Sequence, residues 1–374
     1  MLLIFGIFLA LFLALLLLVK RHKSRADYIL FIWLLLISAL QMFRYFLDSG
    51  YFFEHPNWLG IELVLPVIHG VMLYLYVVEL TEHVIKNQHT IMLHFLPSLF
   101  LVLLTVPFYM LSDEEKVFVY QNNGIGFEWF VAIEGIVVIV SGLTYSIWSL
   151  IRISKHQKDI KNIFSNTERK ALQWLKLLSI GNGIIFILAL FFETHVTYTA
   201  IAILVLFIGF FGINQLNIFY SDVAEFDTTD DVLTRVPQNQ VAPSLYNGGA
   251  MKGKYVKSGL SDAKALDIYT ALQAVMENNK LYKNQELTLI ELAKHLEVHP
   301  NHLSQVINVR EGKNFHNYIN GLRVNEFIRL ASDAENKKYT MIALAYDCGF
   351  NTKSTFNKHF KLQTGTTPTA FFNS

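Results

Sequence analysis

The sequence predicts an all-α protein, in which a seven-span transmembrane helical bundle precedes a soluble domain of two helix-turn-helix units joined by a connecting helix. Two observations lead to this prediction. Apolar residues make up 53% of the 374 residues, which is too many for one soluble protein, and nearly all of the excess lies before Tyr220. After Tyr220 the composition is that of a soluble domain, and its apolar residues recur at helical spacing.

The first 220 residues are predicted to cross a lipid bilayer seven times. A helix rises 1.5 Å per residue, so roughly 20 apolar residues are needed to cross about 30 Å of hydrocarbon. Pro66, Pro97 and Pro107 are expected to kink or shorten the third and fourth spans. The predicted spans are 1–19, 28–47, 61–80, 91–111, 127–150, 172–192 and 198–219. The alternative for the first stretch is a cleaved signal peptide, but it has neither a basic start nor a small-x-small cleavage pattern.

The short loops between these spans predict the orientation of the bundle. Lys and Arg collect on the cytoplasmic side of a membrane. The first loop (20–25) and the fifth (152–170) are basic, whereas the second and fourth lean acidic. We therefore expect the N-terminus outside and, after seven crossings, the C-terminal domain in the cytoplasm. The expected location is the bacterial cytoplasmic (inner) membrane.

Polar residues inside the spans indicate where a signal would be sensed, because burying them in lipid is costly. Glu62, His69 and Glu134 fall in the outer half of the predicted bilayer and form a candidate sensor site for a small-molecule or membrane signal. The alternative, which is the commoner role, is that they form hydrogen bonds between helices or lie at the interface. No catalytic motif accompanies them, so the sequence predicts neither an enzyme nor a cofactor.

Residues 221–261 are predicted to be a flexible cytoplasmic linker. Periodicity disappears there, and Pro and Gly interrupt a polar run. Roughly 40 flexible residues, at about 5 to 6 Å times the square root of their number, span on the order of 35 Å.

Two similar helix-turn-helix patterns follow, at about 287–309 and 340–362. Ala293 and Ala345 are small where two helices must cross closely. Pro300 suits the first turn of a helix, and Gly349 suits a left-handed turn. Between the two patterns, apolar residues at helical spacing predict one long amphipathic helix: Phe315, Ile319, Leu322, Phe327 and Leu330. A rigid connector would place two recognition helices in neighbouring major grooves, which recur every 34 Å or so.

Residues 262–374 resemble the AraC-type (AraC/XylS) DNA-binding domain. The matching residues are Leu292, Ala293, Leu303, Ser304, Phe315, Ile319, Arg323, Ile342, Ala343, Ala345, Gly349, Phe350, Ser354, Phe356, Phe360, Lys361, Gly365, Thr367 and Pro368. The membrane half is similar to that of membrane-bound regulators that carry this domain, a likeness of architecture and not of motif.

The resemblance implies that double-stranded DNA is the partner and that the helices beginning near Pro300 and Thr352 enter the major groove. Periodicity then indicates which positions face the DNA. The predicted DNA-binding residues are Asn301, His302, Gln305 and Asn308 in the first helix, Thr352, Lys353, Asn357 and Lys358 in the second, and Lys361 and Arg323 as further backbone contacts. Asn and Gln suit adenine edges, and Lys suits phosphates.

Several residues depart from the family pattern. Glu297 stands where the family favours Gly, and a left-handed non-Gly residue costs about 1 to 2 kcal/mol. His299 replaces the usual Ser or Thr cap, a further loss of about 1 kcal/mol, whereas Asn351 is the expected cap of the second helix. Phe327 is large where Ala is common. Residues 262–374 hold 13 Lys and Arg against 11 Asp and Glu, a net charge of +2. Nonspecific attraction to DNA should therefore be modest, and we expect a homodimer on DNA.

No metal site is expected in the soluble domain. His295, His299, His302 and His316 match no zinc signature, so they are interpreted as surface histidines. Cys348 is the only cysteine and is expected to be a small buried apolar residue.

These expectations together predict a membrane-tethered one-component transcription regulator that responds to an unknown extracellular or membrane signal. The alternative is a membrane receptor or transporter-like protein whose helix-turn-helix domain is a protein-interaction module.

Overall fold

The protein is all-α. The computed structural model describes residues 2–81, 88–168, 171–224 and 260–373, and these ranges contain helices and no β-strand. The chain divides into two compact units. Unit 1 is Met1–Ser154 with Leu172–Asp227, and unit 2 is Lys155–Ala171 with Thr228–Ser374.

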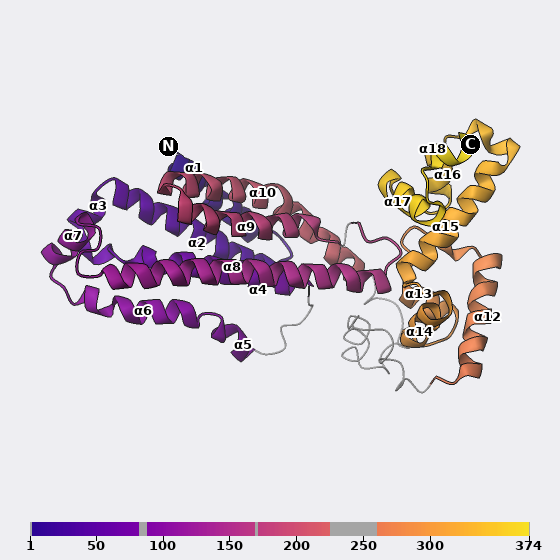
Figure 1. The fold of residues 1–374 in the computed structure, drawn as a ribbon, viewed down its shortest axis with the longest axis horizontal. Helices are drawn as coiled ribbons and strands as arrows, with labels where there is room; N and C mark the ends of the chain where they lie inside the picture. Colours follow the sequence, from indigo (N-terminus) through magenta and orange to yellow (C-terminus); the bar gives the residue numbers. More distant parts are fainter. Residues whose placement is uncertain (1, 82–87, 169–170, 225–259, 374) are drawn as a thin grey trace. The chain divides into compact units, whose positions relative to one another are not determined.

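Unit 1 is a bundle of long apolar helices (Figure 1). Its elements are α1 (Leu2–Val19), α2 (Arg25–Asp48), α3 (Tyr51–Glu54), η1 (Pro56–Trp58), η2 (Ile61–Leu63), α4 (Leu65–Thr81), α5 (Gln88–Leu93), α6 (Leu96–Tyr109), α7 (Asp113–Gln121), α8 (Glu128–Asp159, whose last residues belong to unit 2), α9 (Gln173–Phe191) and α10 (Thr194–Ala224). Helix α2 packs against α1 and α4, and α10 packs against α1 and α9. The main core holds large apolar side chains such as Trp33, Leu73 and Leu175, all at 0% exposure.

Several helices of unit 1 are suited to a membrane. Four of the described helices, namely α2, α8, α9 and α10, are long and apolar enough to span one by length and composition. The number rises to six if two bent pairs each form one span: η1 and η2 with α4, bent by 41°, and α6 with α7, bent by 115°. Helix α1 is apolar but shorter. The count of seven spans stays a prediction.

The proline positions account for the broken helices. Pro66 lies in the first turn of α4, and Pro97 lies at the start of α6. The third predicted span is accordingly divided before α4, and the fourth is divided between α5 and α6. Pro107 lies inside α6, two residues before its end. A proline lacks the N–H that continues a helix, which is why helices begin at or just before it.

Unit 2 contains two helix-turn-helix pairs on either side of one long helix (Figure 1). Its elements are η3 (Ile160–Asn162), α12 (Asp262–Asn278), η5 (Leu281–Lys283), α13 (Leu289–His295), α14 (Pro300–Glu311), α15 (Phe315–Ser332), η6 (Ala334–Lys338), α16 (Met341–Asp347), α17 (Lys353–Thr364) and α18 (Pro368–Asn373). The pairs are α13 with α14 and α16 with α17. Most of the predicted linker lies outside the described residues.

Helix α15 contributes to the cores of both pairs. Its N-terminal half supplies Phe315 and Ile319 to a cluster with α12, α13 and α14. Its C-terminal half supplies Val324 and Phe327 to a cluster with α16 and α17. The Phe327 ring lies 4.5 Å from that of Phe356, so this large residue fills an aromatic core. One rigid helix therefore fixes the spacing of the two pairs.

The structure changes one predicted boundary. The basic loop at 152–170 was predicted to belong to the 1–220 region, but its described residues from Lys155 onward cluster with unit 2. Ile163 is 5% exposed and packs in the first core cluster of that unit. Burial of apolar surface in unit 2 is the physical reason for the change.

Candidate nucleic-acid interface

The first helix-turn-helix begins with a complete capping box. The Thr288 hydroxyl accepts a hydrogen bond from the Glu291 backbone N–H (3.1 Å), and the Glu291 carboxylate accepts one from the Thr288 N–H (2.8 Å). The turn that follows contains Glu297 at φ 53°, the left-handed conformation that the sequence predicts at this position. A non-glycine residue is therefore strained at the turn.

His299 corrects the expectation of a lost cap. It is the N-cap of α14, and its Nδ1 accepts a hydrogen bond from the Asn301 backbone N–H at 3.2 Å. The imidazole nitrogen therefore performs the task of the usual hydroxyl.

The predicted DNA-binding residues of α14 are only half accessible. Asn301, His302, Gln305 and Asn308 are all of intermediate exposure. The Asn308 amide donates to the Ser304 carbonyl at 2.8 Å, and the His302 ring lies 5.8 Å from that of His299. Helix α12 packs against α14, which accounts for part of this burial. In this arrangement α14 presents less free polar surface than its sequence suggests.

The second helix-turn-helix turns at Gly349, which has φ 97° as its glycine predicts. The N-cap of α17 is Thr352, whose hydroxyl accepts from the Thr355 N–H at 3.2 Å. This corrects the expectation that Asn351 is the cap. The Asn351 side chain instead donates to Glu286 at 2.8 Å. Gly365, at φ 79°, ends α17 as predicted.

Helix α17 presents an exposed basic row. Phe356, His359 and Phe360 form its buried face. Four of its predicted DNA-binding residues are exposed: Lys353, Asn357, Lys358 and Lys361. Lys353, Asn357 and Lys361 are spaced by four residues and so lie in one row along the helix. This row, which we call the α17 row, brings together three of the predicted contacts.

Arg323 is not on the surface, contrary to the expectation that it contacts the DNA backbone. Its side chain is 1% exposed. The Nε atom donates to the Tyr282 carbonyl and Nη2 to the Asn284 carbonyl, both at 2.7 Å. Nη1 donates to Asn320 at 3.1 Å. The guanidinium therefore donates to oxygens inside unit 2, and these hydrogen bonds link the segment before α13 to α15.

Two histidines are buried rather than surface residues. His316, expected on the surface, is 5% exposed, and its Nε2 lies 3.1 Å from Nε2 of His359. Burial lowers the pKa of His316 to about 4 and that of His359 to about 3, so both are neutral at pH 7. Within the described residues, no group of three or more His, Cys, Asp or Glu side chains is placed to hold a metal ion.

Cys348 is buried, as the sequence predicts. Burial raises the pKa of its thiol to about 12, which keeps it protonated and unreactive.

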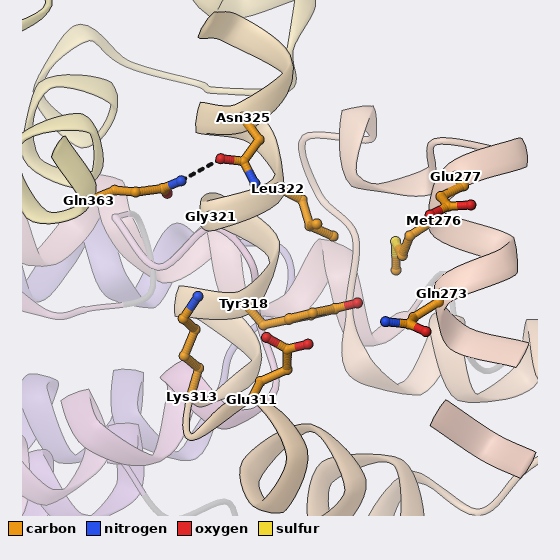
Figure 2. Close-up of a pocket in the computed structure, with 10 residues that line it drawn as sticks. All are labelled: Gln273, Met276, Glu277, Glu311, Lys313, Tyr318, Gly321, Leu322, Asn325 and Gln363. Carbon is orange, nitrogen blue, oxygen red and sulfur yellow. Dashed lines mark hydrogen bonds between the residues drawn. The ribbon is translucent and has the colours of Figure 1, made fainter. Parts of the chain in front are cut away.

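A polar cavity of about 190 Å³ lies beside α15 (Figure 2). Figure 2 shows Gln363 of α17 donating to Asn325 of α15 on one side of that helix, and Gln273 and Met276 of α12 on the other. No sequence pattern predicts this cavity, because its walls come from four separate helices.

In unit 1 the structure brings together two of the three candidate sensor residues. His69 and Glu134 line a mainly apolar cavity of about 330 Å³, with Asn182 and Tyr198 as further polar lining residues. Neither ring nitrogen of His69 has a hydrogen-bond partner among the described residues. Glu62 does not line this cavity, and its carboxylate accepts a hydrogen bond from Tyr120 at 2.6 Å. Polarity within an apolar span was a usable signal for Asn182 but not for Tyr198, since tyrosine is common at span ends.

Comparison with known proteins gives a match that lies in unit 2. Residues 292–374 match a family model described as a helix-turn-helix domain, of the AraC type. The matched region runs from within α13 through α18 and includes the α17 row. No curated protein and no solved structure gave a match to the chain. The match supports a DNA-binding regulator of the AraC type, and all of unit 1 and of the predicted linker lies before the matched residues.

Proposed function

We propose that this protein is a membrane-tethered one-component transcription regulator, in which unit 1 senses a signal and unit 2 binds promoter DNA. The observation that carries the proposal is the presence, in one chain, of several helices apolar enough to span a membrane and of an AraC-type domain with an exposed basic helix.

DNA contact is expected to be strongest at α17. Lys353, Lys358 and Lys361 are exposed and suit phosphate oxygens, and Asn357 suits an adenine edge. Helix α14 is the weaker reader, because Asn301, His302, Gln305 and Asn308 are half-buried. Arg323 acts from inside the domain by fixing the segment before α13.

A single domain with a net charge of +2 should attract DNA only modestly, so stable occupancy is expected from a homodimer. Two copies joined to the same membrane raise the effective concentration of one domain beside the other. A signal that alters the packing or dimerisation of unit 1 would then shift the population of DNA-bound protein.

The signal is expected to bind in the cavity of unit 1. Its mainly apolar lining and the unpartnered His69 imidazole beside Glu134 suit a small amphipathic molecule with a hydrogen-bonding group. The first position to test is therefore His69, with His94 as the control, since Nδ1 of the His94 ring lies 3.2 Å from the Tyr145 hydroxyl and His94 does not line that cavity.

The alternative, a protein-interaction module, is favoured by two observations: the low net charge of the domain and the half-buried residues of α14. The two functions differ in what the α17 row does. A DNA reader requires the lysines for binding to nucleic acid, whereas an interaction module does not.

The test is capture of genomic DNA fragments by the full-length protein in lipid nanodiscs at low salt. Replacing Lys353 and Lys358 by Glu should remove two phosphate contacts and lower the slope of log affinity against log salt by about 2. The control replaces Lys337 and Lys338 of η6, both exposed, by Glu and should keep binding. If the wild-type protein enriched no genomic fragment over a scrambled duplex, the proposal would be wrong.

The topology needs a separate measurement. A reporter that is active only in the cytoplasm should be active when it is fused after Ser374 in a bacterial inner-membrane assay. Activity on the opposite side would rule out promoter binding by the intact protein.

A further inference from the structure

The segment between α8 and α9 is built into the DNA-binding unit. Phe164 forms an antiparallel bridge with Thr288, the cap of α13. The Ser165 N–H donates to the Leu287 carbonyl at 3.2 Å, and the Leu289 N–H donates to the Ile163 carbonyl at 2.8 Å. Main-chain pairing of this kind fixes the register of the segment against unit 2.

Ser165 is the buried anchor of this segment, at 0% exposure. Its carbonyl accepts hydrogen bonds from His316 Nδ1 at 2.7 Å and from the Asn320 amide at 3.0 Å. Its hydroxyl accepts one from Arg323 at 3.2 Å. All three donors lie on α15, the helix that spaces the two helix-turn-helix pairs. A connecting loop ordinarily runs over the surface, so a buried, fully hydrogen-bonded backbone indicates a specific docked state.

The segment ends at the start of the second recognition helix. The Glu168 carboxylate accepts hydrogen bonds from the hydroxyls of Thr352 (2.6 Å), Ser354 (3.1 Å) and Thr355. Nearby, Asn166 and Asn351 both donate to Glu286, at 2.9 and 2.8 Å. The hydroxyls at the start of α17 are therefore occupied by the Glu168 carboxylate, and Glu286 holds Asn351 just before the helix.

A carboxylate in this place resembles a DNA phosphate. Helix N-termini, with their free N–H groups and positive dipole end, bind anions, and hydroxyl side chains are frequent donors to DNA phosphates. Burial alone would raise the pKa of Glu168, but the hydrogen bonds from the three hydroxyls lower it below its ordinary value. Glu168 is thus an anion at neutral pH, in contact with Thr352, a predicted DNA-binding residue.

We propose that residues 160–168 are a built-in competitor of DNA, with Glu168 occupying the position where a DNA phosphate would bind at the start of α17. The docked protein is then a low-affinity state. The segment is continuous with α8 and, through residues 169–172, with α9, so a rearrangement of these helices by a signal can withdraw it. The inference rests on the proposed function, since it concerns the regulation of the same DNA-binding surface.

The geometry gives a direct prediction for Glu168→Gln. The amide removes the negative charge while keeping the size of the side chain, so the docked state loses its charge-assisted hydrogen bonds. Because the apparent Kd is the intrinsic Kd divided by the competent fraction, a shift toward the undocked state should tighten DNA binding, by about tenfold.

The experiment measures binding of a fluorescently labelled duplex of mixed sequence to the full-length protein in nanodiscs at low salt. Glu277→Gln is the matched control, because it makes the same charge change on α12, outside the contacts that Glu168 makes with Thr352, Ser354 and Thr355. Tighter binding by Glu168→Gln alone supports the competitor. Equal affinity of wild type and Glu168→Gln, or equal tightening by both variants, overturns it. Absence of binding by every variant overturns the proposed function instead.

A reversible cross-link tests the competition itself. In the double variant Glu168→Cys, Ser354→Cys, a short bifunctional thiol reagent with a cleavable disulfide should join the segment to α17, while Cys348 stays buried. The locked protein should lose DNA binding, and a reductant should restore it, which excludes misfolding as the cause. Undiminished DNA binding by the locked protein would mean that the segment and DNA are accommodated together, and the inference would fail.

Discussion

Replacement of Arg323 by Met separates a structural role from a DNA-binding role. Methionine keeps most of the apolar stem and removes the guanidinium. The side chain is 1% exposed and donates to the carbonyls of Tyr282 and Asn284 at 2.7 Å, to Asn320 at 3.1 Å and to Ser165 at 3.2 Å. Three of these partners, Tyr282, Asn320 and Ser165, are buried and have little access to water in its place, whereas Asn284 is exposed.

The magnitude follows from those contacts. Hydrogen bonds from a charged donor contribute about 1.5 to 3 kcal/mol each, and the carbonyls left without a donor add a desolvation penalty. The cost of burying the guanidinium offsets part of this, and burial lowers the pKa of Arg323 to about 10, which still leaves it charged at pH 7. We expect a net loss of about 3 to 5 kcal/mol in the free energy of unfolding of unit 2.

Cys348 provides the assay. It is the only cysteine and is 0% exposed, so a thiol reagent reaches it only when unit 2 opens. Since each 1.4 kcal/mol is a factor of ten, Arg323→Met should label about two to four orders of magnitude faster than wild type. Lys361→Met, an exposed position on α17, should label at the wild-type rate and weaken DNA binding.

The opposite pattern would refute the reasoning. If Arg323→Met labelled Cys348 at the wild-type rate and lowered the salt dependence of DNA binding by about one phosphate contact, Arg323 would be a surface contact. The expectation from the family resemblance, that Arg323 contacts DNA, would then hold, and the conclusion that its guanidinium is buried would be wrong.

Two further predictions concern the turn glycine and the buried histidines. A Cβ added to Gly349, at φ 97°, would lie 2.7 Å from the Tyr282 carbonyl oxygen, so Gly349→Ala should lower the free energy of unfolding by about 3 kcal/mol or more. Gly365, at φ 79°, has no atom within 4 Å of an added Cβ, so Gly365→Ala should lower it by only about 1 kcal/mol. Equal Cys348 labelling rates in the two variants would contradict this. His316 has its pKa lowered from 6.5 to about 4, so between these values the unfolded chain binds a proton that the folded chain does not. The free energy of unfolding should therefore fall by up to about 3 kcal/mol as pH falls from 6.5 to 4 and be insensitive to His316 above pH 7. Hydrogen exchange of α15 amides, corrected for intrinsic exchange rates, measures this free energy of unfolding at each pH. If His316→Gln showed the same pH dependence as wild type, the loss of stability would not come from His316.

The backbone conformation at turns was predictable where the residue at the turn decides it. The glycines at 349 and 365 predicted left-handed turns because the absence of a Cβ makes that conformation inexpensive, and the structure confirms both. Glu297 was also correctly placed in a left-handed turn. The identity of caps was less predictable, since Asn351, Thr352 and His299 all carry suitable acceptors and only the exact backbone path selects among them.

Contacts between distant segments were not predictable from spacing. Periodicity identifies the apolar face of a helix but not which polar residue is enclosed by another segment. Arg323 therefore looked like a surface contact, and only the approach of η5 and of Ser165 makes it internal. For the same reason Glu62 looked equivalent to His69 and Glu134, although only the latter two share a cavity.

The sequence by itself determined the helical class, the change from an apolar to a soluble composition, and two helix-turn-helix pairs around one connecting helix. These features depend on composition and on periods of a few residues. Tertiary structure alone decided that residues 160–168 dock against the DNA-binding unit and place Glu168 at the start of α17. That contact joins residues more than 180 positions apart, and its free energy comes from burial and hydrogen bonds that exist only once both segments have folded.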